Sequence, residues 1–211
     1  MQSTVKKITQ SVIWDNVQNI IVAKSNAPVA DIAFTSFETT EKGNWEFTGD
    51  GIFEISSPAG KKCYNLTANS GLKKINLTAA KTYIISYWSK NGSYLVNGAA
   101  PFLTGTAING WTYYKHKVTN ALLVTISGNG YIDELRIHPE NAQMTSVAFE
   151  PLIGLTSESG INGQITKYEY DSFGRLVSIK DQFGNVSKVF CYTSKGLSSF
   201  VAMCLFLKII F

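Results

Sequence analysis

The sequence contains few of the residues that build disulfide-linked or metal-bound scaffolds. Its 211 residues include only three cysteines, two histidines and three methionines. Cys63, Cys191 and Cys204 are odd in number and far apart, so they predict neither a disulfide framework nor a CxxC metal site. His116 and His138 have no cysteine or second histidine at the spacing of zinc ligands. A zinc enzyme is therefore not expected.

Charged residues are also scarce, at 16% of the chain. A total of 19 basic residues against 15 acidic ones gives a formal net charge of +4. The lysine pairs at 6–7, 61–62 and 73–74 are scattered along the sequence. A nucleic-acid partner is not expected, because such binding needs a clustered basic patch.

The chain also lacks the long hydrophobic run that targets or anchors a protein. Residues 1–29, an N-terminal lead-in, have no apolar core and no small-residue cleavage site, so no signal peptide is predicted. Residues 193–211 form an atypical apolar tail that is shorter than the roughly 20 apolar residues of a spanning helix. We interpret this tail as a truncated or frame-shifted end; a membrane-touching tail or a core element are the alternatives. Membrane binding is not expected.

Motifs of enzymes are absent as well. The sequence has no Gly-x-Ser-x-Gly, HExxH or P-loop motif and no glycine-rich dinucleotide fingerprint. Asp133 and Glu134 are adjacent on an expected strand, so their side chains should point to opposite faces and cannot flank one glycosidic bond. The prediction is a non-catalytic protein.

What the sequence does have is aromatic residues and glycine, with 12 Phe, 10 Tyr, 4 Trp and 17 Gly. This mixture favours short strands and tight turns, and no window has a clean helical period. Asn91-Gly92 predicts a hairpin between two of the strands. Alternating apolar residues predict strands at 32–37, 45–47, 63–66, 72–77, 83–88, 94–96, 113–119, 122–126 and 131–137. The fold class is therefore predicted as all-β, with an antiparallel two-sheet sandwich.

The two ends of this strand-rich region carry a resemblance. The region opens with Phe37-Glu38 followed by Trp45, and closes with the strand 131–137. This resembles the galactose-binding-like jelly rolls of carbohydrate-binding modules, and it assigns such a domain to residues 30–140. The resemblance implies that the first and last strands lie together and that Glu38 and Asp133 help to hold a structural calcium ion. Two carboxylates with loop carbonyls suit Ca²⁺; alternatively, both carboxylates bind backbone amides.

The same resemblance implies carbohydrate binding through aromatic side chains. The candidates for the platform are Trp45, Trp88, Trp111 and Tyr114. Aromatic residues are also common core fillers in such folds, so a core role is the alternative. Strand alternation puts Tyr87 and Trp88 on opposite faces, which predicts that at most one of the two faces the core.

A second and more specific motif follows in the sequence. Within residues 163–192, the spacing of tyrosine, Tyr-Asp, Gly-Arg-Leu and Gly-Asn resembles the YD repeat of the Rhs family. The matching residues are Gly163, Tyr168, Tyr170, Asp171, Gly174, Arg175, Leu176, Asp181, Gly184 and Asn185. The pattern predicts antiparallel strands that turn at 172–174 and again at 182–184, where aspartate can accept bonds from turn amides and glycine supplies a positive φ. One such hairpin cannot bury its own face, so it must stack on neighbours and should be marginal alone.

Residues 141–162 are expected to be a linker, since Pro139, Pro151 and Gly154 mark the ends of elements. Its Pro-Leu-Ile-Gly-Leu-Thr run is similar to the lead-in of YD repeats in large surface proteins of the Bacteroidetes kind. The chain thus looks like a non-catalytic fragment of a large secreted or cell-surface Rhs/YD-repeat protein. The resemblance implies repeats that build a β-shell for an effector or for cell-surface interaction, with the rest of the parent protein as partner. The alternative is a carbohydrate-binding module that recognises surface glycans.

Overall fold

The computed structural model describes residues 10–67, 71–193 and 196–197. The fold is all-β and antiparallel, as predicted. The only helical element among the described residues is a short 3-10 turn, η1 (Val29–Asp31). The tail expected at 193–211 lies almost wholly outside the described residues. Only the small ladder of β18 (Tyr192–Thr193) and β19 (Gly196–Leu197) reaches into it.

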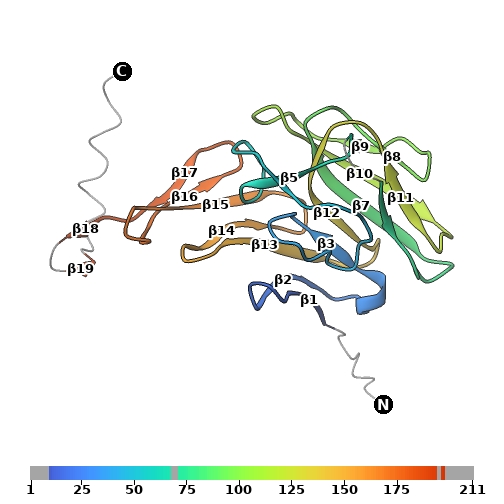
Figure 1. Ribbon diagram of the computed structural model, residues 1–211, viewed down its shortest axis with the longest axis horizontal. Helices are drawn as coiled ribbons and strands as arrows, with labels where there is room; N and C mark the ends of the chain where they lie inside the picture. The colour runs from blue at the N-terminus through green and yellow to red at the C-terminus, as the bar shows by residue number, and fades with distance from the viewer. Residues whose placement is uncertain (1–9, 68–70, 194–195, 198–211) are drawn as a thin grey trace, which may run out of the picture.

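The strands form three layers (Figure 1). The outer sheet has the order β6 (Leu72–Lys74), β11 (Val124–Ser127), β8 (Leu95–Val96). The middle sheet has the order β4 (Ile52–Phe53), β5 (Lys62–Asn65), β12 (Tyr131–Pro139), β7 (Thr82–Ser89), β10 (Thr112–Thr119), β9 (Leu103–Thr104), and β3 (Ala33–Thr35) also pairs with β12. The third layer, which we call the repeat sheet, has the order β1 (Ser11–Asp15), β2 (Ile20–Ser25), β13 (Met144–Glu150), β14 (Gly154–Ser159), β15 (Ile165–Tyr170), β16 (Leu176–Asp181), β17 (Val186–Val189).

The outer and middle sheets enclose the main core. Alternation along β7 turns Tyr83, Ile85 and Tyr87 inward, and they meet Val124 and Ile126 of the outer sheet. All five side chains are fully buried. These two sheets are the predicted sandwich, and β3 lies beside β12 as expected of its first and last strands.

The middle sheet is buried on its other face too. Trp88, Trp111 and Tyr113 of that face pack with Ile165 of the repeat sheet. Tyr87 and Trp88 lie on opposite faces of β7, as alternation predicts, and only Tyr87 faces the main core. Both are buried, because a second apolar layer covers the face that was expected to meet solvent.

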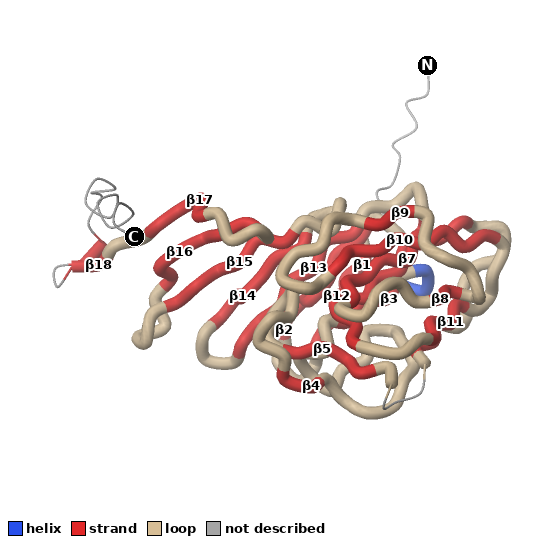
Figure 2. Tube along the Cα trace, turned by 90° about the horizontal axis from the view of Figure 1, so that it is seen from above, coloured by secondary structure: helices blue, strands red, loops and turns tan. Residues whose placement is uncertain are grey.

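The repeat sheet draws on stretches that the sequence presented as lead-in and linker. β1 and β2 lie within residues 1–29, and β13 and β14 lie within 141–162. Ser25 of β2 is the register partner of Met144 of β13, so the chain leaves the sheet after β2 and returns at β13. Figure 2 shows β13 to β17 side by side in a ladder that extends beyond the sandwich.

The hairpin predicted at Asn91-Gly92 does not form. β7 pairs with β10 and β12, whereas β8 pairs with β11, so the turn carries the chain from the middle sheet to the outer sheet. Tyr87 and Tyr94 stabilise this crossing, since their rings stack with centroids 5.6 Å apart and the Tyr94 amide donates to the Tyr87 hydroxyl.

Candidate functional site: the repeat hairpins and their contacts

The turn between β15 and β16 is built by one aspartate. Asp171 Oδ1 accepts the backbone N–H groups of Phe173 and Arg175, at 2.9 and 3.0 Å. Its other oxygen pairs with the Arg175 guanidinium at 2.8 Å. These bonds lower the pKa of Asp171, and the bond from the backbone N–H of Arg175 is the main cause. Gly174 closes the turn at φ +73°, a conformation that costs glycine little.

The turn between β16 and β17 repeats this design ten residues later. Asp181 Oδ1 accepts the N–H groups of Phe183 and Asn185, both at 2.9 Å. The side-chain amide of Asn185 donates to the second oxygen, where Arg175 stood in the first turn. Gly184 has φ +87°. The predicted turns at 172–174 and 182–184 are thus confirmed. In each, the aspartate binds the turn amides, the glycine adopts a positive φ, and the arginine or asparagine binds the second oxygen of the aspartate.

The two motif tyrosines lie on the face of the repeat sheet that points away from the sandwich. Ile165 and Lys167 of β15 point toward the sandwich, so alternation sends Tyr168 and Tyr170 to the other face. Both reach sideways over β14: the Tyr168 hydroxyl donates to Glu158, and the Tyr170 hydroxyl donates to the carbonyl of Leu155. Each motif tyrosine therefore ties its strand to the preceding one.

Gly163 brings the repeat hairpins onto the sandwich. Its φ is +78°, and a Cβ atom placed there would lie 2.3 Å from Cζ of Tyr113. The ring of Tyr113 is 9% exposed and packs against Trp88 at a centroid distance of 5.3 Å. The first glycine of the motif is thus required by contact as well as by backbone conformation.

A buried ion pair joins the same two layers. Arg136 Nη2 lies 2.7 Å from Glu134 Oε2, and both side chains are about 3% exposed or less. Arg136 also donates to the carbonyl of Gly160 in the turn before β15, and Ser146 of β13 donates to Glu134. All of these groups are hydrogen-bonded across the interface, which ties β12 to the repeat sheet.

Glu38 and Asp133 converge on one loop, residues 57–62. Glu38 Oε1 accepts the N–H groups of Lys61 and Lys62, at 2.9 and 2.7 Å. Asp133 Oδ2 accepts the Ser57 hydroxyl and the Ala59 N–H, at 2.8 and 3.1 Å. Burial raises the pKa of Glu38 to about 7 and holds the pKa of Asp133 well above its usual range.

The hydrogen bonds of this arrangement favour backbone binding over a calcium ion. Glu38 Oε1 and Asp133 Oδ2 each receive two hydrogen-bond donors, whose positive ends occupy the directions that a cation would need. The described residues also hold no group of three or more His, Cys, Asp or Glu side chains that could bind a metal. The geometry favours the alternative that the carboxylates bind backbone amides, and calcium binding stays a prediction.

The four aromatic residues named for a sugar platform lie inside the protein. Trp45, Trp88, Trp111 and Tyr114 are between 1% and 7% exposed. A pyranose needs an exposed ring face, and none of these four rings offers one. None of the four aromatic residues proposed for carbohydrate binding can therefore form an exposed sugar-binding platform.

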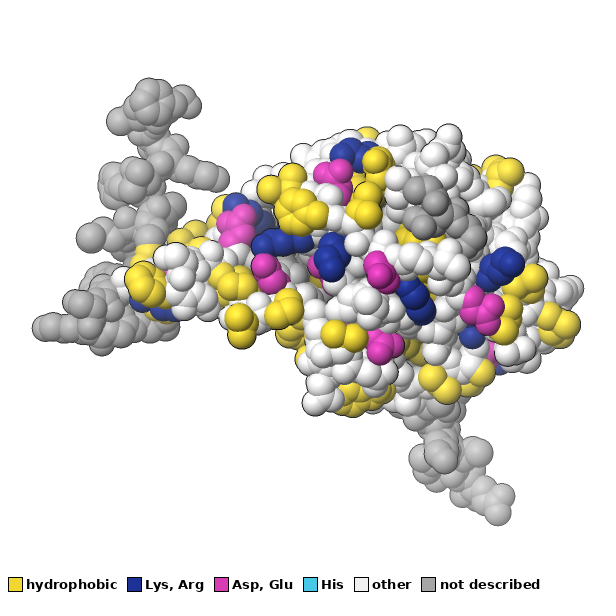
Figure 3. All heavy atoms as spheres, in the orientation of Figure 1, with side chains coloured by type: hydrophobic (Ala, Val, Ile, Leu, Met, Phe, Trp, Pro, Cys, Tyr) yellow, Lys and Arg dark blue, Asp and Glu magenta, His cyan; other side chains and the backbone are white. Residues whose placement is uncertain are grey.

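An apolar groove of about 1060 Å³ lies beside the turns β1–β2 and β13–β14. Its exposed large hydrophobic residues are Val17, Phe53 and Leu152, and the Lys61–Glu150 ion pair lies within it at 2.7 Å. Basic and acidic side chains are interspersed over the face seen in Figure 3. No helix among the residues placed by the structure is long and apolar enough to cross a membrane.

The family comparison concerns the end of the chain that these turns occupy. Residues 154–186 match the family model of the RHS Repeat. These residues are therefore similar to an RHS repeat. The match begins at Gly154, nine residues before the motif glycine, so the matched segment contains β14 as well as β15 and β16. Sequence reasoning missed β14 because its inward residues, Ser157 and Ser159, are small and polar.

Curated relatives extend the similarity beyond the RHS repeat. The chain is 26% identical to Teneurin-1 of Gallus gallus over 173 residues and 26% identical to Teneurin-1 of Homo sapiens over 176 residues, each match covering 75% of the chain. Teneurin-4 of Mus musculus is 27% identical over 182 residues, or 79% of the chain. Residues 154–211 alone cannot supply such coverage, so part of the preceding chain matches too. The chain spans about 6% of the length of these relatives.

Proposed function

We propose that this chain is part of the wall of a large secreted or cell-surface RHS/YD-repeat protein. Its repeat hairpins build a β-shell that encloses an effector or presents a surface to other cells, and the sandwich braces that wall from one side. The role is enclosure rather than catalysis. The observation that carries the proposal is the repeat sheet, which runs through seven strands from β1 to β17 and contains the RHS repeat.

The burial of the repeat sheet supports this role. β15 is anchored on the sandwich through Ile165, which is 3% exposed, whereas every residue of β17 is exposed. A strand at a sheet edge presents backbone groups that pair with a further strand. Repeat units of this kind bury their faces only by stacking on neighbours. The relatives are far longer than the chain, which supports a larger parent protein.

Hydrogen exchange of the chain tests the proposal. Protection should be strongest in β7 and β12, intermediate in β14 and β15, and weakest in β17, because β17 has one strand neighbour and no buried residue among those described. Equal protection from β7 to β17 would mean that the repeats form a complete domain, which contradicts a wall segment.

Surface labelling tests the location. An antibody against the sandwich should label intact cells that express the parent protein, or detect that protein in the medium. Labelling only after the cells are permeabilised would contradict a secreted or cell-surface location. An antibody to a cytosolic protein is the control for cell integrity.

A further inference from the structure

Four of the five hairpins of the repeat sheet share an irregularity that their sequences conceal, whereas the β14–β15 hairpin keeps an unbroken register. In each of the four, the strand that follows the turn carries one extra residue close to the turn, so the register shifts by one. In β15–β16 the shift falls between Glu169↔Ser178 and Tyr170↔Leu176, and in β16–β17 between Ile179↔Lys188 and Lys180↔Val186. In β1–β2 it falls between Ile13↔Ala23 and Trp14↔Ile21, and in β13–β14 between Ala148↔Ser157 and Phe149↔Leu155. The first two hairpins lie in the recognised repeats. The last two, β1–β2 and β13–β14, carry no Tyr-Asp motif, although β14 itself lies within the matched residues 154–186.

The residues at the shift correspond as well. Tyr170-Asp171 is an aromatic residue followed by an acid, and the equivalent positions are Trp14-Asp15 in β1 and Phe149-Glu150 in β13. The second recognised hairpin has Lys180-Asp181 there, so the acid is common to all four hairpins and the aromatic residue to three. In β1 and β13 the carboxyl-bearing residue is the last of the strand.

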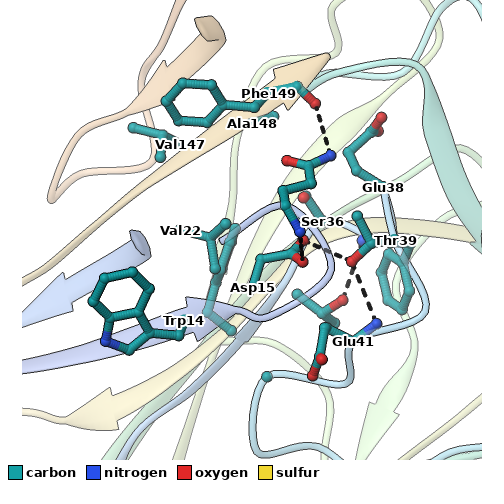
Figure 4. A pocket seen from close by; sticks show the side chains of 15 residues that line it. Trp14, Asp15, Val22, Ser36, Glu38, Thr39, Glu41, Val147, Ala148 and Phe149 are labelled. Atoms are coloured by element: carbon teal, nitrogen blue, oxygen red, sulfur yellow. Dashed lines mark hydrogen bonds between the residues drawn. The ribbon is translucent and has the colours of Figure 1, made fainter. Parts of the chain in front are cut away.

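Asp15 also accepts a backbone N–H of its own turn, although it accepts one such group where each repeat aspartate accepts two. Its Oδ1 accepts the N–H of Gln18 in its own turn, at 3.0 Å. Figure 4 shows Asp15 beside Thr39 of the sandwich, whose hydroxyl donates to the second oxygen at 2.7 Å. In the RHS repeat, that second oxygen is bound by Arg175 instead. The β1–β2 turn therefore keeps an aspartate that binds a turn amide, with the amide three residues on and with a sandwich residue at the second oxygen.

We propose that β1–β2 and β13–β14 are divergent units of the same repeat array, so that the sandwich is inserted between two repeat hairpins. It follows that the free edge of β1 is an interaction surface whose partner is an antiparallel strand from a further repeat hairpin of the parent polypeptide. This inference rests on the proposed function and extends the array to the N-terminal side of the sandwich.

The edge of β1 has the character that this partner requires. Within the described residues, β1 pairs with β2 alone. Its sequence, Ser-Val-Ile-Trp-Asp, contains no lysine and no proline, the residues that usually protect an edge strand from pairing. Neighbouring strands of the repeat sheet are all antiparallel, which sets the direction of the next one.

A turn graft tests the shared register. Residues 16–19 are replaced by Ser-Phe-Gly, so that Asp15 precedes the turn sequence of Asp171. A matched control carries Gly-Phe-Ser, which has the same composition but leaves serine at the positive-φ position. The Ser-Phe-Gly graft should hold the melting temperature within about 2 °C, whereas the control should lose at least about 4 °C. An equal loss in both grafts overturns the assignment of β1–β2 as a repeat unit.

A peptide tests the edge. The probe is a fluorescent synthetic peptide of residues 164–182, which contains β15, its turn and β16, with a scrambled peptide as control. Ser11→Pro and Val12→Pro remove N–H groups on opposite sides of β1, so one variant loses a bond to β2 and melts lower, and the other keeps its melting temperature. Binding measured by fluorescence anisotropy should be saturable and should weaken more than tenfold in the variant that melts normally.

Two results overturn the edge proposal. One is the absence of saturable binding to the unchanged chain. The other is that the peptide still binds the proline variant that melts normally but no longer binds Ser187→Pro. Ser187 lies in β17, so that result would place the peptide on the opposite edge of the repeat sheet. Neither result depends on hydrogen exchange or cell labelling, so failure of this inference is distinguishable from failure of the proposed function.

Discussion

Replacing Gly163 by alanine should detach the repeat hairpins from the sandwich. Alanine at φ +78° costs about 1–2 kcal/mol. The new Cβ atom would also lie 2.3 Å from Cζ and 2.5 Å from the hydroxyl oxygen of Tyr113, and such overpacking costs about 1–3 kcal/mol. The expected loss in the free energy of unfolding is therefore about 2–5 kcal/mol.

Two other repeat glycines separate these contributions. Gly174 has φ +73°, and its nearest neighbour would be 4.0 Å from a new Cβ atom; Gly184 has φ +87° and nothing within 4 Å. Gly174→Ala and Gly184→Ala should each lose only the backbone contribution of about 1–2 kcal/mol. Urea unfolding followed by tryptophan fluorescence measures all three, since Trp88 and Trp111 lie in the same cluster as Tyr113.

The reasoning is refuted if Gly163→Ala costs no more than the two controls. A second test is Tyr113→Leu, which shortens the obstructing side chain. In that background, Gly163→Ala should cost close to the backbone contribution alone, and a double-mutant cycle gives the difference. An unchanged cost would mean that Tyr113 is not the obstacle.

Four further predictions concern contacts described above. Arg136→Met should cost about 3–5 kcal/mol because it leaves Glu134 buried without its ion partner, and Glu134→Gln/Arg136→Met should cost less; equal losses in urea unfolding would exclude that explanation. Leu152→Gly should raise stability by about 1 kcal/mol while Leu152→Ala changes little, because Leu152 is fully exposed at φ +67° and alanine pays the same backbone cost. Stability should fall as pH rises from 4.5 to about 7, because the unfolded Glu38 carboxyl loses its proton before the folded one, and Glu38→Gln should flatten that slope in thermal melts at each pH. In the same melts calcium and a chelator should give equal melting temperatures; a rise with calcium that Glu38→Gln removes would instead establish the calcium site.

The elements that could be predicted from the sequence are those whose signal is local. Strands 83–88, 113–119 and 131–137 alternate clearly, and the turns at 172–174 and 182–184 carry their own aspartate and glycine chemistry. Such features depend on residues a few positions apart. They do not require knowledge of the distant layers.

The elements that could not be predicted depend on partners far away in the sequence. β13 turns Ser146 and Ala148 inward, and these small residues give little hydrophobic contrast. Trp88 is buried only because a sheet that includes Ile165 covers it. The residues that bind Glu38 and Asp133 lie in the loop 57–62, for which the sequence offers no marker. Long-range packing therefore decided the features that sequence reasoning missed.

The adjacency of β2 and β13 has a consequence for the order of folding. Asn26 and Gln143 are hydrogen-bonded to each other where the chain leaves and re-enters the repeat sheet. Closing an unfolded loop of this length costs roughly 4 kcal/mol in chain entropy. A sandwich that folds first holds both ends together and meets that cost before any pairing between β2 and β13 begins. On the ribosome, the N-terminal hairpin must wait for the sandwich, so a mutation that slows folding of the sandwich also delays the joining of the repeat hairpins on its two sides.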